Sequence, residues 1–151
     1  MKVNEEERAL LLAEVTQALD QIRSPELRVA YGELLTALDQ KQDIPEELYE
    51  PLQNLLAVGL ESGRIRAVHT AHGEMAAQRV YHRTPAGRGV RESTEAVNAA
   101  LQALKGQAVD EISVSPGGPG TYVLTVATDE GKLLIKLSRH GAHLQSMEVG
   151  G

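Results

Sequence analysis

Apolar residues recur at every third or fourth position along the first 62 residues, the spacing of amphipathic helices. The first stripe consists of Leu12, Val15, Leu19 and Ile22. Asn4 precedes it, and Glu7 follows three residues later, which is the sequence pattern of a capping box. We therefore predict a helix that begins just after Asn4 and ends before Ser24.

Two further helices are predicted before residue 62. Ser24 and Pro25 suit the N-cap and first position of a helix that runs to about Gln40. Asp43 and Glu46 form a second capping-box pattern, which predicts a third helix to about Glu61. Three amphipathic stripes joined by short loops predict a compact helical unit.

The segment from Gly63 to Arg91 has a weaker pattern. Gly63 suits a left-handed helix terminator, and we interpret residues 64–69 as a short extended segment. Gly73 is predicted to be a break. Residues 74–83 fit helix or strand; the helix is preferred because it aligns the apolar side chains better. Residues 84–89, with one proline and two glycines, are predicted to form a loop.

The last 60 residues are predicted to begin with a helix capped by Ser93 or Thr94. After this helix, apolar and polar residues alternate with a period of two in four segments, which are separated by glycine-containing turns. This pattern is typical of an antiparallel meander with one face packed on the core and the other exposed to solvent. The predicted fold class is therefore α+β: an N-terminal helical unit of three to four helices, then a helix packed on a four-stranded antiparallel sheet. The predicted domains are 1–91 and 92–151, or one continuous domain.

Composition narrows the chemistry. The 151 residues include no cysteine, which excludes disulfides, thiolate zinc sites, iron–sulfur clusters and cysteine nucleophiles. There is no Phe or Trp, so few flat surfaces can stack a base or a cofactor. The chain has no secretory signal pattern and no apolar run long enough for a membrane, so a cytoplasmic protein without membrane contact is expected. No cofactor is predicted.

Charge is distributed unevenly. Residues 1–62 carry five basic and thirteen acidic side chains, whereas residues 63–91 carry six basic and one acidic. The basic segment either docks on the acidic helices of its own chain or binds an anion or an acidic partner. The candidate binding residues are its arginines, namely Arg64, Arg66, Arg79, Arg83, Arg88 and Arg91.

The same segment contains three histidines and one carboxylate that are candidate ligands for a metal ion. The weak candidates are His69, His72, Glu74 and His82, whose side chains are of the kind that zinc, iron or nickel takes in a protein without cysteine. Their spacing differs from the helical pair of a metalloprotease motif. Solvated surface histidines are the preferred interpretation, with Glu74 paired to Arg79 or Arg83. A metal-dependent enzyme is the second alternative function.

Part of the sequence resembles PadR-type winged-helix regulators. The matching stretches are Leu48-Tyr49, then Gly63-Arg64-Ile65-Arg66, and Tyr81-His82-Arg83-Thr84-Pro85-Ala86-Gly87-Arg88. The resemblance covers about residues 25–91 and implies a short strand, a basic wing and a second wing strand. It also implies a DNA-binding regulator that uses the arginine-rich segment, although the net charge of −6 disfavours nucleic acid as a partner.

No catalytic constellation is found; there is, for example, no G-x-S-x-G elbow. We therefore interpret the chain as a non-enzymatic binding or interaction module that self-associates as a homodimer. The basic segment 63–91 is its expected contact surface, toward a second copy, another protein or an anionic partner.

Overall fold

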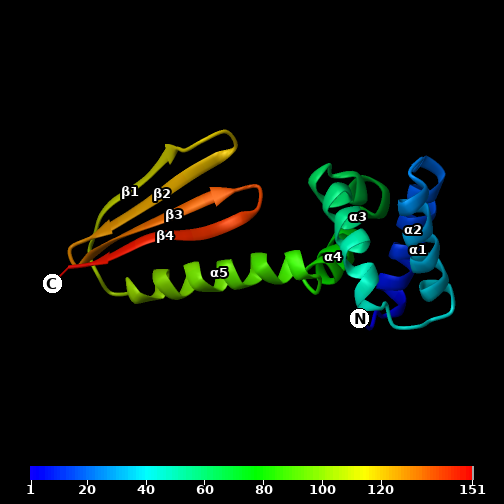
Figure 1. Ribbon diagram of the computed structural model, residues 1–151. Helices are drawn as coiled ribbons and strands as arrows, with labels where there is room; N and C mark the ends of the chain where they lie inside the picture. Colours follow the sequence, from blue (N-terminus) through cyan, green and yellow to red (C-terminus); the bar gives the residue numbers. More distant parts are fainter. Residues whose placement is uncertain (151) are drawn as a thin grey trace. The chain divides into compact units, whose positions relative to one another are not determined.

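The computed structural model describes residues 1–150 and divides the chain into two compact units, Met1–Arg88 and Gly89–Gly151. The first unit is helical. The second holds one helix on a four-stranded antiparallel sheet, so the predicted α+β class is confirmed (Figure 1). Among the described helices, none is both long enough and apolar enough to cross a membrane.

Four α-helices build the first unit. They are α1 (Glu5–Gln21), α2 (Pro25–Asp39), α3 (Tyr49–Glu61) and α4 (Arg64–Tyr81), with a short 3-10 helix, η1 (Glu46–Leu48), before α3. The predicted start of α1 is confirmed: the Glu7 N–H donates to Asn4 Oδ1 at 2.8 Å, and the Asn4 N–H donates to the Glu7 carboxylate at 3.1 Å. The Ser24 cap of α2 is also present.

The capping box predicted at Asp43 is wrong. The segment before α3 begins with η1, whose N-cap is Pro45, and no side chain caps it. The reason lies in Ile44, which is fully buried and whose N–H donates to the Met1 carbonyl at 3.0 Å. Anchoring Ile44 in the core leaves Asp43 exposed and two residues short of the cap position.

The extended segment predicted at 64–69 is also wrong, because these residues form the first half of α4. The predicted helix over 74–83 is confirmed as the second half of α4, up to Tyr81. Gly73 lies inside this helix; the break falls at Thr70, where φ is 64° and ψ is −178°. Ile65 and Val80, both fully buried, anchor the two halves in one core. Tertiary packing thus overrides the weak local pattern.

The loop predicted at 84–89 is the first turn of α5 (Pro85–Ala103). Proline suits a first helical position, and the Gly87 N–H donates to the Thr84 hydroxyl oxygen at 3.3 Å, so Thr84 acts as the cap. Ser93 and Thr94, predicted as caps, lie inside α5. Their hydroxyls donate back to the Val90 carbonyl at 3.0 and 2.8 Å.

Neither segment that the winged-helix resemblance assigns to a strand is extended: residues 64–66 lie in α4, and residues 81–88 comprise the end of α4, a turn and the start of α5. In residues 1–88 the structure contains no strand. The wing that this resemblance implies is not formed.

The second unit contains the predicted meander. Its strands are β1 (Val109–Pro116), β2 (Thr121–Thr128), β3 (Gly131–Ser138) and β4 (Gly141–Val149), in the order β1-β2-β3-β4 (Figure 1). All three pairs are antiparallel, with register shifts between Val109 and Glu111 and between Leu134 and Ile135. The alternation predicted for each strand places its apolar residues on one face of the sheet.

Candidate functional site

Arginines of the basic segment dock on the acidic start of α1. The Arg79 side chain lies 2.7 Å from Glu6 Oε2 and 3.6 Å from Glu7 Oε1. Arg83 lies 2.6 Å from Glu7 Oε2 and also donates to the Lys2 carbonyl at 2.6 Å. Glu7 is buried and already accepts the Asn4 N–H, so it joins a helix cap to two arginines. These contacts tie the end of α4 to the start of α1.

A second set of contacts between α4 and α1 is centred on Glu14, whose side chain is completely buried. The Arg64 guanidinium contacts both carboxylate oxygens, with Nη1 at 3.0 Å from Oε1 and Nη2 on Oε2. Nη1 also donates to Gln17 at 2.8 Å, and His69 Nε2 lies 2.8 Å from Glu14 Oε1. A buried carboxylate needs such partners because removal from water is costly. The first half of α4 is therefore held to α1 by polar contacts.

The other three candidate arginines behave differently. Arg66 pairs with Glu74 at 2.9 Å on the same helix, so the partner predicted for Glu74 (Arg79 or Arg83) is wrong. Arg91 lies 3.7 Å from Glu95, one turn further along α5. Arg88 has no carboxylate within 4.0 Å in the part of the chain that the structure describes. Partner binding by the six arginines stays a prediction, whereas Arg64, Arg79 and Arg83 have a structural role.

The four candidate metal ligands are not brought together. His69 contacts Glu14, His72 lies 2.6 Å from Glu6, and Glu74 contacts Arg66. The His82 ring lies beside Tyr81, with ring centroids 6.2 Å apart. Across residues 1–150, no group of three or more His, Cys, Asp or Glu is placed to hold a metal ion.

The break in α4 is strained. Thr70 combines φ 64° with ψ −178°, a region populated almost only by glycine. The break also brings neighbouring turns together, because a Cβ on Gly73 would lie 2.3 Å from the His69 Cβ. Side-chain contacts on both sides, from His69 to Glu14 and from Arg79 to Glu6, hold this geometry in place.

We expect Thr70→Gly to stabilise the protein by about 1 kcal/mol, since glycine adopts this φ without the steric cost that threonine bears. Thr16→Gly is the matched control, because Thr16 is exposed in a regular part of α1 and its replacement should cost about 1 kcal/mol. Urea denaturation of both variants checks the prediction. A destabilised Thr70→Gly protein would contradict it.

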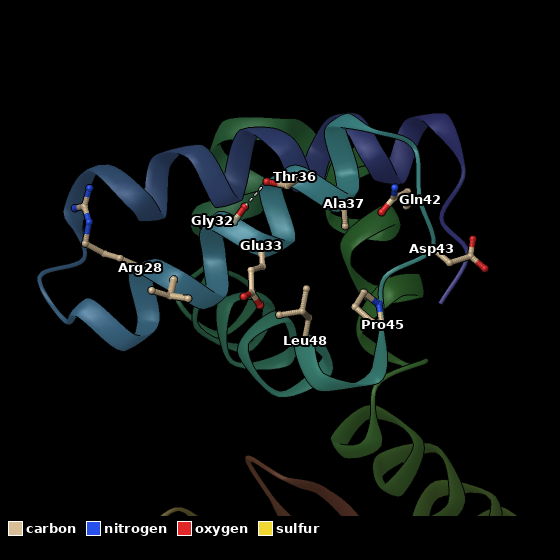
Figure 2. A pocket seen from close by; sticks show the side chains of 10 residues that line it. Arg28, Gly32, Glu33, Thr36, Ala37, Gln42, Asp43, Pro45 and Leu48 are labelled. Carbon is tan, nitrogen blue, oxygen red and sulfur yellow. Dashed lines mark hydrogen bonds between the residues drawn. The ribbon is translucent and has the colours of Figure 1, made fainter.

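A shallow groove of about 540 Å³ runs beside α2 (Figure 2). Its lining mixes apolar residues, among them Ala37, Pro45 and Leu48, with charged ones. The Arg28 guanidinium donates hydrogen bonds to the Leu19 and Ile22 carbonyls, at 3.1 Å each, and is therefore not free to bind a ligand in the groove. Figure 2 shows the Asp43 carboxylate pointing away from Glu33. Polar groups therefore do not converge in the groove as they do in a catalytic or ligand pocket.

A smaller hollow of about 270 Å³ lies beside Glu14 and Arg64, with Tyr31 in its wall. Burial raises the pKa of the Tyr31 phenol above its usual value of 10.0. The hydroxyl donates to the Pro51 carbonyl at 3.2 Å. Because its pKa rises further above 7, the Tyr31 hydroxyl stays protonated at pH 7 and does not supply a general base.

The apolar face of the sheet is only partly covered. The core of the second unit comprises Val97, Ala100, Val126, Leu133 and Ile135, with Leu101, Leu104, Leu124, Leu137 and Ala142 packed against it. These residues come from α5, the turn that follows it, β2, β3 and β4, and none comes from β1. A helix about 10 Å wide cannot cover four strands spaced about 4.8 Å apart.

Three large side chains therefore remain exposed on the β1 side of this face. Ile112 is 66% exposed, Val114 61% and Tyr122 54%. The register puts them on the same face as the core, since Ile112 lies opposite Val126 and Val114 opposite Leu124. We call Ile112, Val114 and Tyr122 the apolar strip. An apolar strip in contact with the edge of a core is typical of an interaction surface.

Sequence reasoning identified the strip residues as members of a dry face but did not find that they are uncovered. The width of one helix against four strands was the available signal. It also missed Glu14, although an acidic residue between Leu11 and Val15 on an apolar stripe is a visible anomaly.

No protein-family model matches the chain, and the comparisons with curated proteins and with solved structures found no match either.

Proposed function

We propose that this protein is a non-enzymatic interaction module that self-associates through the apolar strip of its second unit. The observation that carries this proposal is the partial cover of the sheet: β1 supplies no residue to the core, and its two central apolar side chains are more than half exposed. Burying apolar side chains of this size is favourable by about 1.5–3 kcal/mol each, so a partner surface gains from covering them.

The contacts in the first unit also support this proposal, because several charged groups there already have partners within the chain. Arg64, Arg79 and Arg83 already hold α4 on α1, and the candidate metal ligands are dispersed among separate partners. A contact surface built on the sheet needs none of these groups. The apolar strip is therefore a better supported contact surface than the basic segment.

The test is the oligomeric state of the purified chain. At roughly 100 μM, far above the micromolar dissociation constants of weak specific complexes, we expect size exclusion with light scattering to give a dimer. The dimer should persist at high salt, because apolar contacts are not screened, whereas an interface formed by the arginines would weaken. A monomer under these conditions would overturn the proposal.

Ile112→Glu should convert the dimer to a monomer, because it places a charge in the contact while the side chain is too exposed to disturb the fold. Val58→Glu is the matched control: Val58 is an equally exposed apolar residue, at 67%, on α3 in the first unit. This variant should remain dimeric. A dimer that tolerates Ile112→Glu would place the contact elsewhere.

A further inference from the structure

The two edges of the sheet are not equivalent. β4 carries its irregularity near its middle, where Leu134 pairs with Ser146 and Ile135 pairs with Leu144. In β1 the irregularity lies at the start, between Val109 and Glu111, and pairing is regular from Glu111 to Pro116. A central bulge protects an edge against pairing with another strand. β1 is therefore the edge that can accept a further strand.

The outward backbone groups of β1 can be assigned from its turn. The Gly117 N–H donates to the Thr121 carbonyl at 2.9 Å, and the same register continues to Ser115–Val123 and Ser113–Thr125. Hydrogen-bonded pairs alternate along an antiparallel ladder. Ser113 and Ser115 consequently bond toward β2, so Ile112 and Val114 direct their N–H and C=O groups outward.

We propose that two copies of the chain join through β1 strands that pair antiparallel, with Ser113 opposite Ser113 of the second copy. This inference rests on the proposed function and specifies its geometry. In this register Ile112 lies opposite Val114 of the second copy, and Val114 opposite its Ile112. The two outward pairs exchange four backbone hydrogen bonds around a two-fold axis.

Neighbouring registers are worse. An axis at Val114 places Ile112 opposite Pro116, which has no N–H to donate. An axis at Ile112 places Val114 opposite Asp110, inside the irregular start of the strand. Only the axis at Ser113 uses regular backbone with both donors present.

Side chains fit the same register. Glu111 lies opposite Ser115 of the second copy, so the acidic starts of the two strands do not face each other, and a hydroxyl is available to donate to each carboxylate. On the other face, Ile112 and Val114 of the two copies form one apolar cluster. That cluster joins the two apolar strips into a continuous surface.

Single-cysteine cross-linking tests the register, because the natural chain has no cysteine. Ser113 would form a non-hydrogen-bonded pair, in which Cα atoms are about 4.5 Å apart, within the range of about 4.4–6.8 Å that a disulfide spans. We expect Ser113→Cys to give a disulfide-linked dimer on mild oxidation. Ser146→Cys, at a similarly half-buried serine on β4, is the matched control and should stay uncross-linked.

Val114→Pro provides a second measurement. Proline is tolerated on an edge strand where the N–H faces solvent, so this variant should keep its circular dichroism spectrum and become monomeric. A wild-type monomer would overturn both the proposed function and this pairing. A wild-type dimer that depends on Ile112, yet survives Val114→Pro and gives no Ser113→Cys cross-link, would overturn the β1 pairing alone.

Discussion

Arg64→Ala should lower the free energy of unfolding by about 3 kcal/mol, because it leaves the fully buried Glu14 carboxylate without its guanidinium partner. Arg64 is itself about one-third exposed, at 31%, and His69 still contacts Glu14, so we expect the lower end of the range for a broken buried pair. Arg64→Lys keeps the charge but cannot contact both oxygens, and should have an intermediate effect.

The control is Arg66→Ala, which removes an exposed ion pair from the same helix and should cost less than about 1 kcal/mol. Urea denaturation monitored by far-ultraviolet circular dichroism measures all three variants, since four of the five α-helices in residues 1–150 lie in the first unit. Equal stability of the Arg64→Ala and Arg66→Ala proteins would mean that Glu14 needs no guanidinium.

Gly87→Ala should be destabilising by about 3 kcal/mol, at the upper end of overpacking effects. A Cβ at this position would lie 1.9 Å from the Tyr81 carbonyl oxygen and 2.7 Å from the His82 Cα, and backbone atoms cannot move aside as a flexible side chain can. The start of α5 would have to separate from the end of α4.

Gly89→Ala is a matched control two residues further along the same helix, where an added Cβ has no atom within 4 Å. It should stabilise the protein by about 0.5–1 kcal/mol, the usual gain from replacing a helical glycine. Thermal unfolding of the two variants checks both signs. A Gly87→Ala protein as stable as Gly89→Ala would show that the close approach of α5 to Tyr81 does not constrain the fold.

Local signals predicted much of this fold. Asn4 and Ser24 cap helices because their side chains satisfy free N–H groups within a few residues, which a sequence records directly. The period of two along β1 to β4 likewise depends only on neighbouring positions. The helix–sheet class followed from these patterns without knowledge of any long-range contact.

The errors occur where distant residues decide the local structure. The first half of α4 lacks an apolar stripe because Arg64 and His69 face α1 and bind Glu14, fifty or more positions away. Proline and glycine near residue 85 suggested a loop, but Pro85 fits a first turn once Thr84 caps it. The exposed strip could not be located before the cover provided by α5 was known.

The meander has a consequence for the order of folding. Its paired residues lie close together in the chain; even Val109 and Thr128, near the open end of the first hairpin, are only 19 positions apart. The Arg64–Glu14 and Arg83–Glu7 pairs close loops of 50 and 76 positions. Because contacts between residues close in sequence form first, the sheet should assemble before these ion pairs with α1 form. A chain that refolds from denaturant would then present the edge of β1 while the helical unit is still incomplete.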